Sequence, residues 1–260
     1  GALAASEALA APDAVVGTDA RDATNDRTGP FETDATLVVD PPDKVVTPLG
    51  ASVDHSGASI ARLLASAEEE LLLSSPYFVP GGRGVPLFAE LRARGVRVSI
   101  LTNSLASNDV PAVHASYAGY REALLRLGVE LYEFKPLTGE SRDWSLLESE
   151  RASLHAKTFV IDASRVFVGS FNLDPRSFFH NTEMGVVLEN ADFGRSIRAR
   201  WQDTLPKVAY RLELDEDGRM LWRETLDGGG ERLHRHEPMT TGTERLTSRA
   251  LSWLPVGWLM

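Results

Sequence analysis

Hydrophobic and polar positions in the first half of the chain form a pattern that predicts buried strands separated by amphipathic helices. Apolar residues recur with helical spacing in three segments, at 56–70, 84–95 and 110–128. Short apolar stretches typical of buried strands lie before, between and after them, at 36–39, 71–74, 96–104 and 129–134. This repeated order of strand and helix predicts an α/β layered domain with parallel strands.

The second half of the chain is predicted to contain closely spaced strands. Three strand patterns follow one another, at Leu154–Ile161, Arg165–Phe171 and Glu183–Leu188, and a helix is predicted at 191–204. Two hairpins should follow, turning at Asp217-Gly218 and at 228–230. The expected fold is therefore a mixed, largely parallel sheet flanked by helices, with a small C-terminal β-hairpin extension.

Composition divides the chain into three parts. Residues 1–34 are rich in Ala, Asp and Thr, which predicts a flexible acidic leader. Residues 35–205 hold the predicted layered domain. Residues 206–260 hold the hairpins and an apolar, Trp-containing end, for which two interpretations stay open: a segment apposed to a membrane, or a tail packed on the domain.

Charge and residue usage exclude several classes of function. The formal net charge of −10 argues against non-specific nucleic-acid binding, which requires a cationic surface. The absence of cysteine excludes disulfides, thiolate catalysis and Cys-based metal sites. No apolar run reaches the roughly 20 residues that a membrane-spanning helix requires.

One stretch, "LHAKTFVIDASRVFVGSFNL", combines a strand-like alternation with polar residues that a core does not need. Burying polar groups is unfavourable unless they are hydrogen-bonded, so their presence indicates chemistry. The polar residues are His155, Lys157, Asp162, Ser170 and Asn172, and Gly169 completes the spacing His-x-Lys-x4-Asp-x6-Gly-Ser-x-Asn.

The spacing of these residues predicts a site for a phosphate group. His155 and Lys157 are two positions apart, so their side chains should leave the same face of a strand, and Ser170 and Asn172 repeat this spacing on the next strand. If the strands pair, a cation and neutral donors converge with an imidazole that can act as nucleophile or acid. Asp162 has the opposite parity, and we expect it to hold the turn between the strands.

These residues resemble the HKD motif of the phospholipase D superfamily. The segments "DPPDKV", "SPYFVPG", "GVELYEFKP" and "NTEMGVV" add a resemblance to the second half of bacterial cardiolipin synthases of the C type. The resemblance implies transfer of a phosphatidyl group between phospholipids through a phosphohistidine intermediate, with no metal ion or other cofactor. It also implies that Glu183 accepts a hydrogen bond from the catalytic His155, while Lys157, Ser170 and Asn172 bind the phosphate.

Members of this superfamily use two such motifs across one site, and this sequence holds one. Of six histidines, only His155 is followed two positions later by lysine. The second motif is therefore expected from an upstream part of a longer protein, from a second copy of the chain or from a partner chain. Whether His155 is the nucleophile or the general acid/base stays open.

Four further residues are candidates for lining the substrate site. Asn103 and His114 lie after a predicted strand, where loops of α/β sheets often form sites, although His114 is also typical of a helix surface. Arg176 and Asn181 flank the motif, and Arg176 is equally compatible with an ordinary ion pair.

The leading hypothesis is a cardiolipin synthase-type phosphatidyltransferase in the bacterial cytoplasm, peripheral to the inner membrane. Its partners would be phosphatidylglycerol, a second phospholipid, the membrane surface and a second HKD half-domain, without nucleic acid. Two alternatives are a homodimeric single-motif phosphodiesterase, acting as nuclease or phospholipase D, and a non-catalytic half-domain that acts by contact.

Overall fold

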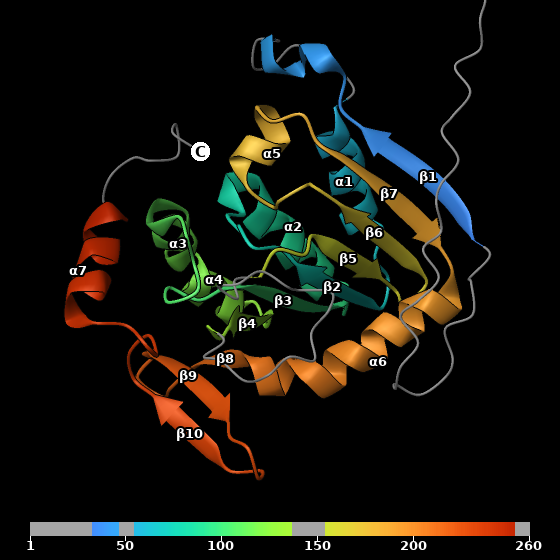
Figure 1. Ribbon diagram of the computed structural model, residues 1–260. Helices are drawn as coiled ribbons and strands as arrows, with labels where there is room; N and C mark the ends of the chain where they lie inside the picture. Colours follow the sequence, from blue (N-terminus) through green and yellow to red (C-terminus); the bar gives the residue numbers. More distant parts are fainter. Residues whose placement is uncertain (1–32, 47–54, 137–153, 253–260) are drawn as a thin grey trace, which may run out of the picture. The chain divides into compact units, whose positions relative to one another are not determined.

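A ten-stranded mixed sheet organises the described part of the chain, which in this computed structural model comprises residues 33–46, 55–136 and 154–252. Its strands run in the order β1-β7-β6-β5-β2-β3-β4-β8-β9-β10 (Figure 1). Their bounds are β1 Asp34–Val39, β2 Glu70–Ser74, β3 Arg97–Asn103, β4 Glu130–Phe134, β5 Thr158–Ile161, β6 Arg165–Gly169, β7 Met184–Glu189, β8 Ala209–Leu214, β9 Met220–Thr225 and β10 Glu231–His234.

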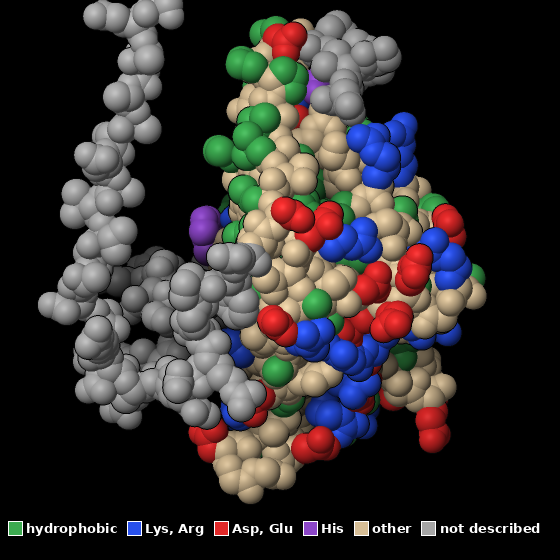
Figure 2. Space-filling view, turned by 90° about the vertical axis from the view of Figure 1, so that its right-hand side faces the viewer, with side chains coloured by type: hydrophobic (Ala, Val, Ile, Leu, Met, Phe, Trp, Pro, Cys, Tyr) green, Lys and Arg blue, Asp and Glu red, His purple; other side chains and the backbone are tan. Residues whose placement is uncertain are grey.

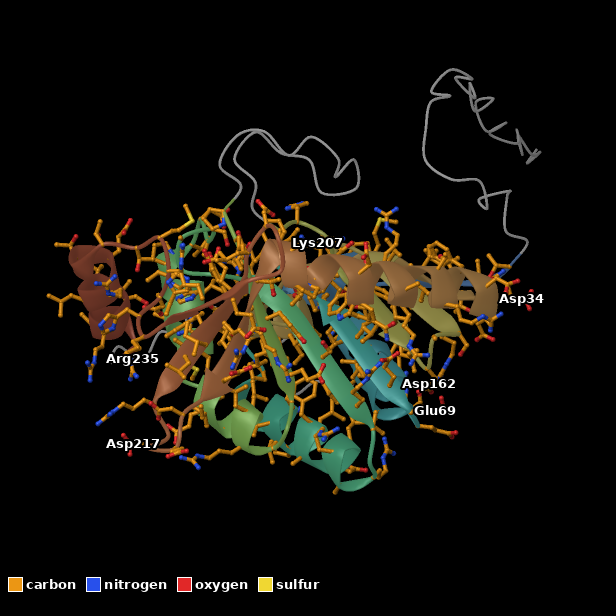
Figure 3. The ribbon with its side chains drawn as sticks, turned by 90° about the horizontal axis from the view of Figure 1, so that it is seen from below. Asp34, Glu69, Asp162, Lys207, Asp217 and Arg235 are labelled. Atoms are coloured by element: carbon orange, nitrogen blue, oxygen red, sulfur yellow. The ribbon has the colours of Figure 1, made fainter. Side chains whose placement is uncertain are left out.

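Helices cover both faces of this sheet, as the sequence predicted. On one face α6 packs Phe193, Ile197 and Trp201 against buried strand residues, and Figure 3 shows α6 on the side of the sheet opposite to α2 and α4. The other face carries the larger core. The helices are 3-10 helix η1 Pro42–Val46, α1 Ser56–Ala65, α2 Gly81–Ala93, α3 Pro111–Ala118, α4 Arg121–Arg126, α5 Pro175–Phe179, α6 Ala191–Val208 and α7 Gly242–Leu251.

The expectation of a largely parallel sheet is correct only for its centre. The pairs β2–β3 and β3–β4 are parallel, whereas every other described pair is antiparallel. Helices α2, α3 and α4 provide the long crossovers that parallel neighbours need. The short connection between β5 and β6 reverses the chain and allows only antiparallel pairing.

Two predicted elements have different bounds in the structure. The predicted helix 110–128 is divided into α3 and α4 at Gly119-Tyr120, and glycine is a weak helix former. Arg121, the first residue of α4, is buried, and its Nη2 lies 2.7 Å from Oε1 of buried Glu133. The predicted strand Leu154–Ile161 begins only at Thr158, so His155 and Lys157 precede β5.

The C-terminal hairpins continue the sheet. Strand β8 pairs with β4, and β9 and β10 follow as antiparallel neighbours around turns that contain Gly218, Gly228 and Gly229. The hairpins predicted from the sequence are confirmed. Most of the predicted leader and the apolar end after residue 252 lie outside the described residues. None of the helices in the described ranges has the length and hydropathy required to cross a bilayer.

Strands β1, β7 and β6 expose an apolar surface beyond the cover of α6, which we call the open apolar face. It consists of Leu37, Val39, Val168 and Met184, all of which are exposed. The register places Leu37 beside Val186 and Val39 beside Met184, so these side chains share one side of the sheet. In Figure 2 hydrophobic side chains gather on the upper part of the molecule, where β1 and η1 lie.

Candidate active site

The predicted motif residues meet at one edge of the sheet. His155 and Lys157 lie before the start of β5, Ser170 and Asn172 follow the end of β6, and Glu183 precedes β7. Because β5, β6 and β7 are consecutive antiparallel neighbours, these three points come to the same edge. Strand β5 also pairs antiparallel with β2, so this edge is the one at which the parallel strands β2, β3 and β4 end. Sites of α/β sheets commonly lie at that edge.

The segment that carries the histidine is held by individual hydrogen bonds. The Lys157 carbonyl accepts a bond from the Gly169 N–H at 3.2 Å, and the Ala156 carbonyl accepts one from Ser74 Oγ at 3.4 Å. Lys157 Nζ donates to the His155 carbonyl at 2.9 Å. His155 itself is exposed, so its imidazole is accessible to a substrate.

Glu183 is the centre of a hydrogen-bond cluster beside the motif. Its carboxylate accepts bonds from the Ser170 hydroxyl, from Ser177 Oγ at 2.8 Å and from Asn181 Nδ2 at 3.4 Å. Among the described residues, no bond from the His155 ring to this carboxylate is present, so the expected hydrogen bond between His155 and Glu183 is not seen.

The electrostatics of the site centre on Lys157. Partial burial lowers the pKa of its ammonium group, while the nearby carboxylates of Glu183, Asp174 and Asp109 act in the opposite direction. Burial raises the pKa of Asp174, although hydrogen bonds from the backbone of Ser177 and Arg176 oppose the shift. These carboxylates favour the charged form of Lys157, and a charged ammonium group can donate hydrogen bonds to a phosphate diester.

Asn172 has a buried side chain with an unused acceptor. Its backbone N–H donates to Ser177 Oγ at 3.1 Å, but no described residue bonds its buried Oδ1. Buried polar atoms are normally paired, so this unpaired acceptor is available to a donor group of a ligand, such as a hydroxyl.

Asp162 lies at the other end of β5 from His155. Its Oδ1 accepts backbone N–H bonds from Glu68, Glu69 and Glu70 at 3.1, 2.8 and 3.0 Å, and Figure 3 shows Asp162 beside Glu69. The residue has a φ of 52°, which is uncommon outside glycine. These bonds tie the turn after β5 to the entry of β2, away from the candidate site.

The other sequence candidates differ in their placement. His114 is fully buried, not on a helix surface or lining a site, and its Nε2 lies 2.6 Å from Arg121 Nη2. Burial, and then the charge of Arg121, place the pKa of His114 well below its ordinary value. Asn103 is 1% exposed as well, so neither side chain reaches the surface of the described structure. Arg176 is exposed beside the motif, and Asn181 contacts Glu183.

A buried ion pair behind Glu183 was not among the residues singled out from the sequence. Lys44 Nζ lies 2.7 Å from Asp40 Oδ2 and donates to the Ser177 carbonyl at 2.8 Å. Asp40 Oδ2 accepts from the Glu183 N–H at 2.9 Å and from Ser56 Oγ at 2.6 Å. The only signal in the sequence was the family-like segment "DPPDKV", which holds both Asp40 and Lys44.

Comparisons with known proteins agree with this architecture. The family described as "Cardiolipin synthase, PLD-like domain" matches residues 60–204, more than half of the chain. Cardiolipin synthase C of Escherichia coli K12 is 44% identical over 201 residues, which cover 76% of this chain and 42% of that protein. An uncharacterized protein of Helicobacter pylori 26695 is 32% identical over 198 residues, covering 75% of this chain and 38% of its own length.

A solved structure has the same fold. The phosphatidylserine synthase of Haemophilus influenzae Rd KW20 superposes with a TM-score of 0.50 at 17% identity, covering 70% of this chain and 41% of that one. The chain spans less than half the length of these relatives. It belongs to the phospholipase D-like family of cardiolipin synthase domains.

Proposed function

We propose that this chain provides one half of the active site of a phosphatidyltransferase of cardiolipin synthase type. The observation that supports this most directly is the meeting of His155, Lys157, Ser170 and Glu183 at one sheet edge. The 44% identity to a cardiolipin synthase C supports a phospholipid as the substrate. Phosphatidylglycerol and a second phospholipid are the proposed donor and acceptor, at the cytoplasmic surface of a bacterial inner membrane.

The proposed reaction has two steps. In the first, an imidazole nitrogen attacks the phosphorus of the donor, the bond from phosphorus to the leaving alcohol breaks, and an acid protonates the alcohol oxygen. In the second step, the group that acted as the acid, now deprotonated, takes the proton of the acceptor hydroxyl. The acceptor oxygen attacks phosphorus, and the bond between nitrogen and phosphorus breaks. Lys157 Nζ, the Ser170 hydroxyl and Asn172 Nδ2 would stabilise the phosphoryl oxygens throughout by donating hydrogen bonds to them.

The two steps require two groups, a nucleophile and an acid/base, and His155 can be only one of them at a time. We propose that the second His-x-Lys motif comes from outside the described residues. Its source would be an upstream part of a longer protein, a second copy of the chain or a partner chain. The open apolar face supports this, because it borders the site: Ser170 N donates to the Met184 carbonyl at 2.8 Å. A second half-domain on this face would bring its own motif to the same edge.

The test measures cardiolipin formed by the full chain on vesicles of phosphatidylglycerol and phosphatidylethanolamine. His155→Ala and Lys157→Ala should each abolish product without changing the unfolding midpoint, because both side chains lie at the site and are not in the core. Lys207→Ala is the matched control, since Lys207 is an exposed cation on α6 that pairs only with exposed Asp203 in the described structure.

If the wild-type chain is inactive alone, the measurement is repeated with the remaining part of the Escherichia coli relative added to supply the second motif. Wild-type activity that survives His155→Ala or Lys157→Ala would refute the proposal. Unfolding of His155→Ala would return the motif to a structural role.

A further inference from the structure

The four residues Leu154 to Lys157 carry the candidate histidine without the regular strand pairing that begins at Thr158. Backbone outside a ladder has more freedom to move, and a reacting group displaced by 1 Å can lower turnover about 100-fold. Contacts from elsewhere must therefore fix this segment if His155 is to act in one geometry.

Asn103 makes the contact at the start of this segment. Its Oδ1 accepts the Leu154 N–H at 2.9 Å, and its Nδ2 lies within donating distance, 3.4 Å, of the Leu154 carbonyl. The side-chain amide thus meets both polar groups of the residue before His155, as a neighbouring strand would.

The amide of Asn103 is itself held in place. Asn103 is 1% exposed and ends β3, whose end lies at the same sheet edge as the start of β5. Ser107 Oγ lies 3.2 Å from Asn103 Oδ1 and 3.0 Å from the Phe134 carbonyl, which ties the loop after β3 to the end of β4. The Nδ2 also lies 3.4 Å from the Pro76 carbonyl. Asn103 is therefore a preorganised amide in a rigid setting.

We infer that Asn103 is a positioning residue that fixes the backbone of Leu154 and thereby sets the place of the His155 imidazole. It does not touch the substrate and acts only through Leu154. This inference rests on the proposed function, because the histidine is the group whose placement matters. Fifty-one residues separate Asn103 from Leu154, and only the parallel pairing of β2 with β3 and the antiparallel pairing of β2 with β5 bring them together.

The test compares Asn103→Leu with Thr102→Val in the full chain. Thr102 is the matched control because it is equally buried on β3 and donates to the same Pro76 carbonyl at 3.2 Å, but it has no bond to the motif segment. Hydrogen exchange at residues 154–157 and the ring signal of His155 by NMR, assigned with His155→Ala, are measured for both. Urea unfolding reports any general loss of stability.

Asn103→Leu should raise exchange at 154–157 by about 10-fold or more and broaden or split the His155 ring signal, while Thr102→Val leaves both as in the wild type. In the lipid assay kcat should fall about 10- to 100-fold with KM within about twofold, since substrate binding is untouched. If Asn103→Leu does not fold, Asn103→Ser, which leaves room for a bridging water, serves for the same comparison.

Equal effects of Asn103→Leu and Thr102→Val, or an unchanged His155 signal and kcat in a folded Asn103 variant, would overturn the inference. The exchange and NMR results remain informative if no lipid activity is found. In that case the proposed function fails, whereas the link between Asn103 and His155 is still decided.

Discussion

At the scale of single residues, the ion pair between Lys44 and Asp40 is the feature that most needs a physical explanation. Both side chains are fully buried, and burying two charges is unfavourable unless each remaining polar atom is bonded. Here Asp40 accepts from Lys44, Ser56 and Glu183, and Lys44 also reaches the Ser177 carbonyl. The pair fixes the backbone of Glu183 and Ser177, whose side chains meet beside Lys157.

Lys44→Met should lower the free energy of unfolding by about 3–5 kcal/mol, because it leaves the Asp40 carboxylate buried without its counter-charge. Urea unfolding measures this. The double variant Asp40→Asn with Lys44→Met should lose less than the single one, since no unpaired charge remains. Lys207→Met, which breaks an exposed pair, is the control and should change stability by less than about 1 kcal/mol. A loss for Lys44→Met as small as that of the control would contradict a role for the pair.

At the scale of elements, the glycine of the motif is explained by the packing between β6 and β7. Gly169 lies opposite Gly185, and the ring of Phe167 lies over both positions. A Cβ on Gly169 would come within 2.7 Å of Phe167 Cζ, and one on Gly185 within 2.9 Å of the Val168 carbonyl oxygen. Phe167 in turn stacks on Phe159 of β5, with ring centroids 5.1 Å apart. The two glycines therefore allow the strands that carry the site to pack around one aromatic pair.

Gly185→Ala should destabilise the fold by about 1–3 kcal/mol, because the added methyl group overpacks the space beside Phe167. Thermal and urea unfolding measure the effect. Gly82→Ala is the control: apart from its chain neighbours and the backbone of α2 itself, no atom lies within 4 Å of the position that the new methyl group would take. Alanine also favours a helix, so stability should be unchanged or raised by up to about 1 kcal/mol. Similar stability of the two variants would show that the close approach between β6 and β7 can relax.

At the scale of the whole molecule, the site and the open apolar face belong together. The face lies on the outer strands β1, β7 and β6. Ser170 directly follows the end of β6, and Glu183 directly precedes β7. In the described part of the chain this apolar surface is exposed beside the site, which supports the proposed assembly of two half-domains. When the chain is studied alone, the occupant of this face that can be tested directly is a second copy.

We expect the full chain to self-associate through the open apolar face, with the association constant measured by sedimentation over a range of concentrations. Leu37→Glu should weaken association at least about tenfold while leaving the unfolding midpoint unchanged, because a charge would be buried between copies. Leu233→Glu is the control: Leu233 is 51% exposed, compared with 60% for Leu37, but lies on β10 at the opposite edge of the sheet. A strictly monomeric wild type, or equal effects of both variants, would refute self-association through this face.

Much of the fold and the site follows from the sequence itself. Hydrophobic periodicity reports which side of a segment is buried, so most strands, the longer helices before residue 209 and the hairpin turns could be located within a few residues, whereas α5 and α7 were not predicted. The motif residues could be identified because histidine, lysine, serine and asparagine at strand-like spacing have no use in a core. Their meeting at one edge was expected only if the strands at 154–161 and 165–171 pair, and the antiparallel order of β5, β6 and β7 fulfils this condition.

The order of the sheet and everything that depends on it were decided only by the tertiary structure. Periodicity contains no information about which distant strand becomes a neighbour, so the antiparallel majority of pairs could not be predicted. The same is true of Asp40, which reaches Glu183 across 143 residues, and of Asn103, which reaches Leu154 across 51. The sequence determined which groups can perform the chemistry, whereas long-range packing decided what holds them, because such contacts depend on the whole sheet and not on any single segment.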